Sequence, residues 1–208
     1  LTHIRHSEKV FIMKRLLLIL ILTFSFQSWT MADDIRDFEV EGMSIGDSLL
    51  DYFSEDFIKK NIFEDYPASD KYKRFYAFKQ NFFKQYEGVQ VNFMKNDKKY
   101  IIAVLAGQID FPDNINECFK FKNRVENDFD RIFKNAEKET GKQKKEYDKT
   151  GKSISYFTTY FLKSGEQVAI TCDDYSKKIS EKKSGILDNL SVSLRSKKFI
   201  YFLRNEAF

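Results

Sequence analysis

Two serines near residue 45 lie in short glycine-containing strings of the kind that hydrolytic enzymes use. Ser44 is at the centre of a Gly-x-Ser-x-Gly string, the pattern of a nucleophile elbow, and Ser48 follows four residues later. In such an elbow a strained turn lifts the serine hydroxyl toward a histidine, which acts as the base. The two histidines of the chain, His3 and His6, both lie far upstream, in a segment that we expect to be removed. A glycine turn followed by a helix cap explains the same residues without chemistry.

The string Gly46-Asp47-Ser48-Leu49 is similar to the tetrapeptide that names the GDSL hydrolases. That resemblance implies a Ser48 nucleophile and an Asp-x-x-His motif near the end of the chain, which this sequence lacks. Residues 38–42 are also too acidic for the buried parallel strand that should present the serine. We therefore predict a domain without enzymatic activity. A GDSL-like serine esterase with an unconventional base is the alternative.

The sequence also has few residues that could bind a metal or a cofactor. Beyond residue 32 the chain has no histidine and only two cysteines, too few for the common zinc and haem sites, so we expect neither a metal nor a cofactor. Asp173 and Asp174 form the best carboxylate pair, but neighbours on a strand point to opposite faces and cannot share acid–base work. A solvated strand end is the plainer interpretation, and Asp174 is kept only as a weak binding candidate.

Tyr156 and Tyr160 are the other weak binding candidates. They are expected on the face of a strand opposite Phe157 and Phe161, away from the long helix. Such an aromatic stripe is either covered by the first or last helix, which is the usual outcome in small domains, or is a binding surface.

A group of lysines surrounds a predicted turn at 149–151. It admits two interpretations: an edge strand that its lysines protect from aggregation, which we favour, or a site for an envelope polyanion. The group consists of Lys142, Lys144, Lys145, Lys149 and Lys152.

The first 32 residues are expected to be upstream sequence followed by a signal peptide. Translation would start at Met13, and residues 14–15 are basic, 16–26 are apolar, and Thr30 and Ala32 supply the small residues of a cleavage site. The apolar run is shorter than the roughly 20 residues of a membrane span. We predict cleavage after Ala32, a periplasmic or secreted protein, and no membrane span in the mature chain.

Charge argues against a nucleic-acid partner. The net charge of +4 for 208 residues includes four basic residues and one acidic residue within 1–32, so residues 33–208 hold 31 basic and 30 acidic residues, a net of +1. Nucleic-acid binding would first require a strong positive excess.

The mature chain, residues 33–208, is predicted to form a single α+β domain. We expect about six or seven antiparallel strands packed on a long central helix, with short helices at both ends. Periodicity places the long helix at about 114–138, begun by Asp113 and ended by Gly141. Period-two patterns predict strands at 72–78 and 89–93.

Two predicted hairpin turns fix the expected cross-strand pairs. A two-residue turn at 96–97 pairs Phe93 with Tyr100, Val91 with Ile102 and Val89 with Val104. A turn at 164–165 pairs Phe161 with Val168, Thr159 with Ile170 and Phe157 with Cys172.

The two cysteines are predicted to form a disulfide. Cys118 falls on the apolar stripe of the long helix, and Cys172 shares a strand face with Val168 and Ile170. If that helix packs on that face, the two sulfurs meet in the core, and an exported chain meets an oxidising compartment. Two unpaired buried thiols are the alternative.

The chain as a whole resembles small exported proteins of unassigned function from AT-rich marine alphaproteobacteria. The likeness lies in residues 38–54, 114–118, 163–174 and 205–207 and extends over nearly the whole mature chain. It implies export and no particular activity. The sequence therefore predicts an exported, non-enzymatic domain that binds an unknown partner or ligand in the cell envelope.

The leader prediction is tested by expressing the full chain in a Gram-negative host. We expect a periplasmic protein whose mass and N-terminal sequence begin at Asp33, and we expect Ala32→Trp to block processing because the signal peptidase site needs a small residue. Recovery of the wild type uncleaved in the membrane fraction would instead show an anchor.

Overall fold

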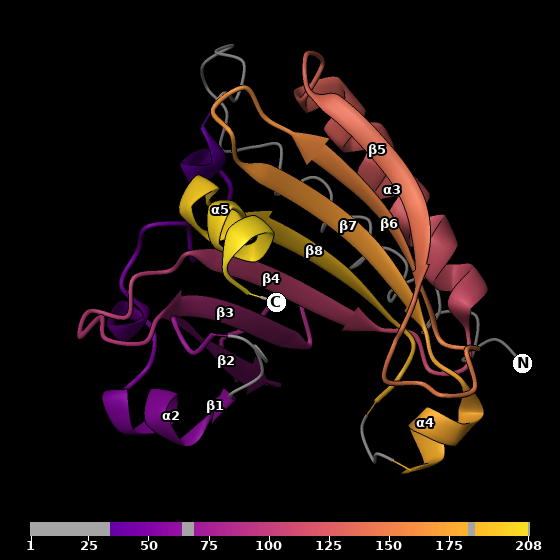
Figure 1. Cartoon of the computed structure of the whole chain (residues 1–208), viewed down its shortest axis with the longest axis horizontal. Helices are drawn as coiled ribbons and strands as arrows, with labels where there is room; N and C mark the ends of the chain where they lie inside the picture. The colour runs from indigo at the N-terminus through magenta and orange to yellow at the C-terminus, as the bar shows by residue number, and fades with distance from the viewer. Residues whose placement is uncertain (1–33, 64–68, 183–185, 208) are drawn as a thin grey trace, which may run out of the picture. The chain divides into compact units, whose positions relative to one another are not determined.

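The structure, a computed structural model, describes residues 34–63, 69–182 and 186–207, without the side chain of Lys182. These residues form an α+β domain with one eight-stranded antiparallel sheet (Figure 1), which confirms the predicted class. The predicted leader and its cleavage site lie outside the described residues. Within the described part of the chain, no helix is long and apolar enough to cross a membrane.

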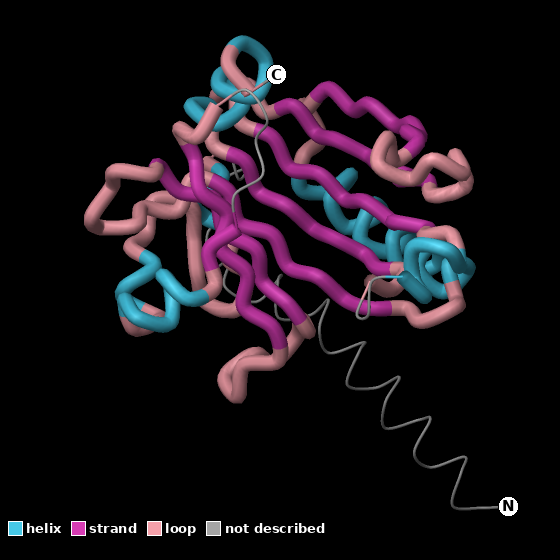
Figure 2. The backbone as a smooth tube through the Cα atoms, turned by 60° about the horizontal axis from the view of Figure 1, so that its bottom comes forward, coloured by secondary structure: helices cyan, strands magenta, loops and turns pink. Residues whose placement is uncertain are grey.

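The sheet has the strand order β1-β2-β3-β4-β8-β7-β6-β5, and every neighbouring pair is antiparallel. Figure 2 shows the strands lying side by side, in magenta. After β4, the chain crosses to the far edge and returns strand by strand, so the last strand pairs with β4 in the middle. The strands are β1 (Ile62–Phe63), β2 (Tyr72–Phe78), β3 (Gly88–Met94), β4 (Val104–Asp110), β5 (Glu137–Lys144), β6 (Ile154–Phe161), β7 (Gln167–Asp174) and β8 (Asn189–Arg195).

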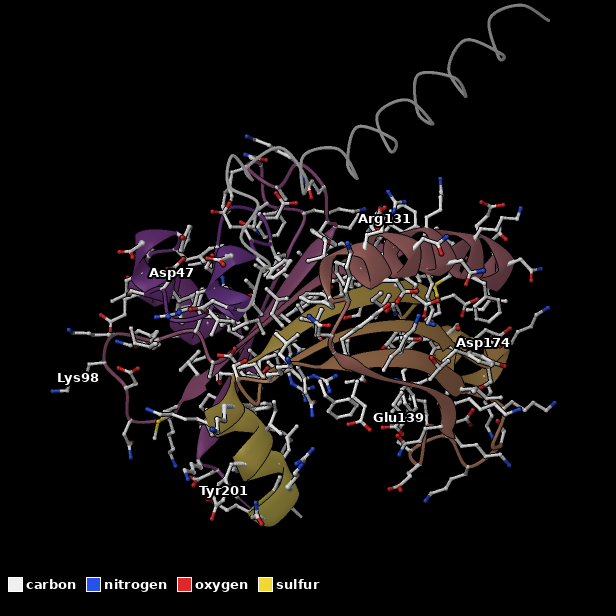
Figure 3. The ribbon with its side chains drawn as sticks, turned by 90° about the horizontal axis from the view of Figure 1, so that it is seen from above. Asp47, Lys98, Arg131, Glu139, Asp174 and Tyr201 are labelled. Carbon is white, nitrogen blue, oxygen red and sulfur yellow. A yellow bond between two sulfur atoms is a disulfide. The ribbon has the colours of Figure 1, made fainter. Side chains whose placement is uncertain are left out.

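Helices lie on both sides of the sheet (Figure 3). The long helix α3 packs on β7 and β8, whereas the last helix packs its phenylalanines against Tyr72 and Val104 on the other side. The helical segments are η1 (Ile35–Asp37), η2 (Leu49–Asp51), α2 (Glu55–Lys60), α3 (Ile115–Ile132), α4 (Lys177–Lys182) and α5 (Lys197–Asn205).

We name the two sides of the sheet by what lies on them. The covered face carries Leu105, Val192 and Ile170 and is packed by α3 and by the N-terminal segment 35–58, which together form the main hydrophobic core. The open face carries the intervening residues of each strand. Among the described helices, only α5 lies on it, near the start of β2 and β4, and Figure 1 looks onto this face with α5 in front.

The long helix is shorter than predicted at its C-terminal end. Asn114 caps it, not Asp113, by accepting a hydrogen bond from the Glu117 amide, and the helix ends at Ile132. The predicted final turn and the predicted stop signal Gly141 belong instead to the neighbourhood of β5, a charged edge strand. The edge strand that the lysine group predicted thus begins within the residues assigned to the end of the helix, and with the two-residue β1 the strand count is eight.

The predicted pairing of the first hairpin is wrong by three residues. Val91 pairs with Leu105, not with Ile102, because residues 100–102 leave the sheet. There the Ile102 amide donates to the Asp47 carbonyl at 2.9 Å, and the Ile102 carbonyl accepts from the Gly46 amide at 2.9 Å. The glycine string that resembled an enzyme motif thus holds residues 100–102 by backbone hydrogen bonds.

The predicted pairing of the second hairpin is wrong by one residue. Tyr160 pairs with Val168 and Tyr156 with Cys172, because the loop has three residues, 163–165, rather than two. Leu162 and Glu166 close it, and Gly165 adopts a left-handed φ of 90°. A slip of one residue moves every side chain of a strand to the other face. Phe157 and Phe161 therefore exchange faces with Tyr156 and Tyr160.

The predicted disulfide is confirmed. Cys118 of α3 and Cys172 of β7 are bonded, with Cα atoms 6.0 Å apart and both residues fully buried. Cys172 faces α3 as predicted, because the register slip changes the face of the β6 side chains and leaves those of β7 where they were. The bond ties the first turn of α3 to the middle of the sheet.

Removal of this bond in a Cys118→Ala/Cys172→Ala variant should lower the free energy of unfolding by roughly 4 kcal/mol, since the bridge closes a loop with a sequence separation of 54 residues. Urea denaturation of the oxidised protein measures the change, with reduced wild type as the control that keeps both side chains. A loss under about 1 kcal/mol would contradict the chain-entropy account.

Candidate binding face

The two serines of the enzyme-like strings serve the backbone. Ser48 Oγ accepts a hydrogen bond from the Leu50 amide as the cap of η2 and donates to the Lys99 carbonyl at 2.7 Å. Ser44 Oγ donates to the Phe38 carbonyl at 3.1 Å. Neither contacts a base, and residues 34–207 contain no histidine. The arrangement gives the esterase alternative no support.

The predicted binding tyrosines lie beneath α3. Tyr160 is 1% exposed, and its hydroxyl donates to Asp130 at 2.7 Å, so burial and this contact raise the pKa of Tyr160. Tyr156 is half-buried and packs edge-on against Phe119 of α3. The register slip explains both positions. These side chains hold the helix on the sheet and do not form a free aromatic stripe.

Asp174 lies at the end of β7 on the same face as Cys172, far from the open face. It is half-buried, and burial raises its pKa. Asp173 points to the other side, as predicted, and forms an ion pair with Lys145 at 2.8 Å. The structure therefore does not bring Asp174 together with either tyrosine into one exposed site.

The lysine group is divided by the structure. Lys142 and Lys144 are exposed on β5, which is the edge strand of the sheet, and Lys149 and Lys152 are exposed in the loop that follows. Lys145 forms the ion pair with Asp173 described above. This arrangement agrees with the interpretation of lysines that protect an edge.

The middle of the open face consists of small side chains, and this surface differs from the sites that the sequence predicted. Pairing aligns Ala106, Ser193, Ala169 and Thr159 in one row across β4, β8, β7 and β6. In the next row, Ser191 and Thr171 are paired on β8 and β7. We call these six residues the small-residue strip.

Larger side chains bound the strip on both flanks. On one side Tyr76 reaches across β3, where Gly88 leaves room for its ring, and donates to Gln108 Oε1 on β4 at 3.2 Å. On the other side the tip of the Phe157 ring lies against Gly141 on β5 and so leans away from the strip. Neither ring covers the middle of the face.

The polar groups of the strip are unusually placed. Ser193 and Thr159 are 7% and 8% exposed, and the neighbouring Gln167 is 9% exposed. Among the described residues none of these three side chains has a hydrogen-bond partner, yet their polar atoms are still reached by solvent. These three side chains therefore lie low in the face but stay open to a hydrogen-bond partner from solution, whether water or a ligand.

The amides beside the strip have fixed orientations. Gln108 Nε2 donates to Asp110 at 2.9 Å while its oxygen accepts from Tyr76, and burial raises the pKa of Tyr76 to about 12, with Asp110 and Glu87 adding to the effect. The Tyr76 phenol is therefore protonated at neutral pH and remains a donor. Such a chain pre-organises polar groups at the flank of the strip.

No metal site accompanies this face: within residues 34–63, 69–182 and 186–207, no group of three or more acidic, histidine or cysteine side chains could hold an ion. The strip itself carries no charge. Its serine and threonine hydroxyls offer hydrogen bonds, and its alanine side chains offer small apolar contacts.

Comparison with known proteins gave no further lead. No family model matches the chain, and no curated protein and no solved structure matches it significantly.

One carboxylate anchors the loop beyond β5. Asp148 is buried and accepts hydrogen bonds from the amides of Thr150 and Ser153 and from three hydroxyls, including that of Ser176 before α4. The Ser153 hydroxyl, ahead of the other donors and against the effect of burial, holds the pKa of Asp148 well below its ordinary value. The ionised form thus stabilises the fold.

The pH dependence of stability should reveal this anchor. Because the folded pKa of Asp148 is lowered, its contribution is complete above the ordinary value of about 3.9 and is lost as pH falls toward the folded pKa. Asp148→Asn should therefore destabilise the protein at neutral pH, and the difference from wild type should shrink below about pH 4. Urea unfolding at several pH values measures it, with Glu146→Gln, an exposed carboxylate of the same loop, as the control. A difference that stays constant down to about pH 2 would contradict this role.

Proposed function

We propose that the protein is an exported domain of the cell envelope that binds a ligand on the open face of its sheet, without chemistry of its own. The single observation that carries the proposal is the group of buried hydroxyl and amide side chains on this face that lack partners within the described chain.

A solvated sheet face would place the same residues differently. Antiparallel sheets often have one wet face, but its polar side chains are well exposed there. Ser193 and Thr159 instead lie low between longer neighbours, with Ala169 between them at 1% exposure. Ligand binding to this strip would cost little side-chain conformational entropy, since small side chains have few rotamers to lose.

Export is supported by the disulfide. A buried bridge between distant segments is typical of proteins that fold in an oxidising compartment. The signal-like start of the chain and the near-neutral charge of residues 33–208 agree with a periplasmic or secreted binding protein that has no nucleic-acid partner.

The proposal predicts that filling the strip abolishes binding. Ser191 is half-buried at the middle of the open face, so Ser191→Trp should place a large ring over Ala169 and Thr171 without entering the main core. The full chain, expressed with its leader in its native envelope, would be isolated with its ligand and studied by native mass spectrometry. We expect the variant to retain less than about one tenth of the ligand held by wild type, a difference of about 1.4 kcal/mol or more.

Ser164→Trp is the matched control, because Ser164 is exposed in the β6–β7 turn, away from the strip. It should keep wild-type ligand occupancy. Thermal unfolding of both variants checks that the fold is intact. Equal ligand retention by Ser191→Trp and Ser164→Trp, in folded proteins, would overturn the open face as the binding site.

A further inference from the structure

We infer that the ligand of the open face is a neutral saccharide, an inference that rests on the proposed function and specifies its chemistry. The reasoning starts from the groups that the strip offers. Four hydroxyls from three adjacent strands lie together, those of Ser191, Ser193, Thr171 and Thr159, and none has a partner among the described residues.

Hydroxyls select for a ligand of their own kind. A serine or threonine hydroxyl both donates and accepts, and the Gln167 amide supplies two donors and an acceptor. Sugar hydroxyls likewise donate and accept. A ligand with many such groups can satisfy all of these side chains at once, which one carbonyl or one amine cannot.

Charge excludes the anionic and cationic alternatives. Recognition of carboxylates or phosphates uses arginine and lysine in direct contact, and recognition of amines uses carboxylates. The strip has no charged member. Of the charged residues next to it on the open face, Arg195 and Glu139 have opposite signs, and Asp173 is paired with Lys145. No single sign of charge therefore prevails beside the strip.

Lipids and peptides fit less well than sugars. An acyl chain on the strip would bury the hydroxyls of Ser193 and Thr159 against hydrocarbon, which is unfavourable without compensating hydrogen bonds. An extended peptide usually adds to the edge of a sheet, where backbone groups are free, whereas the strip lies on the face of four internal strands.

The flanks supply the apolar contact that a sugar ring needs. Phe157 is half-buried on β6 beside Thr171. Because the tip of its ring lies over Gly141 on β5, the ring borders the strip without covering it. Aromatic rings of this kind bind the C–H surface of a flat ligand while polar groups fix its orientation. From Ala106 to Thr159 the strip crosses three strand spacings, about 14 Å, which is longer than one sugar ring.

The test is a titration of the ¹⁵N-labelled exported protein with maltotetraose, cellotetraose and chitotetraose, followed by NMR. Tetragalacturonate and decanoate serve as charged and acyl probes. We expect at least one neutral tetrasaccharide to shift the amides of Ser193, Ala169 and Thr171, with a dissociation constant on the order of 1 mM or tighter.

Two variants examine the contacts. Phe157→Ala should weaken binding about tenfold or more and Phe157→Trp should preserve it, whereas Phe82→Ala, at a 43% exposed ring that packs on Phe53, should have no effect. Thr171→Val removes one hydroxyl at nearly constant shape and should weaken binding about fivefold. Thermal unfolding shows whether a variant that binds weakly is still folded. If Phe157→Ala does not fold, Thr171→Val still tests the contact.

The outcomes distinguish the two proposals. Shifts at the strip caused by tetragalacturonate or decanoate, with none from the neutral sugars, would overturn the saccharide class and leave the open face as the binding site. Absence of shifts with every neutral probe at saturating concentration would also overturn the saccharide. The proposed function itself falls only with equal ligand retention by Ser191→Trp and Ser164→Trp.

Discussion

The fold depends on a shortage of covering elements: one long helix and one N-terminal segment must bury an eight-stranded sheet. They suffice for one face. The disulfide fixes α3 on β7 and β8, and a buried ion pair supports the same contact, with Lys122 Nζ 2.5 Å from Glu126 and 2.8 Å from the Thr158 hydroxyl. Most of the large aromatic residues gather on this side, where the cover lets them leave water, and a smaller cluster with Tyr72, Phe199 and Phe202 forms under α5 on the other face.

The second face must therefore exist without a full cover. Helix α5 shields the start of β2 and β4, and the rest relies on side chains that tolerate water: glutamines, serines, threonines and alanines. Ser193 and Thr159 are more than nine-tenths buried as residues, yet their hydroxyls still reach solvent. This placement between longer neighbours is the basis of the proposed binding face.

The sequence predicted local periodicity well and pairing poorly. The strand at 72–78 has the predicted bounds, and the cysteine pair was found because helical and strand patterns each placed one sulfur toward the core. The registers failed because hairpin loops are set by particular contacts: the bonds between Ile102 and the 46–47 segment, and a three-residue loop at Gly165. The first of these is a long-range contact that leaves no local signature, and the second is a difference of one residue in loop length between two turns that both contain glycine.

The candidate site was missed for the same reason. Alternation in the last strand, with Ser191 and Ser193 between leucine and valine residues, is visible in the sequence, but only the pairing with β7 and β6 shows that four hydroxyls meet. Attention to Tyr156 and Tyr160 followed from a register wrong by one residue, and correcting it moves both beneath the helix.

The position of β8 has a consequence for how the chain acquires its structure. β8 is the last strand in the chain, yet it separates β4 from β7 in the middle of the sheet. Until it arrives, the earlier strands form two half-sheets with unpaired inner edges, the state most open to proteases and aggregation. Contacts between strands this far apart in sequence also form slowly. Nearly the whole chain must therefore be available before the domain can close, and a chain that stops before residue 189 lacks the strand that joins the two half-sheets.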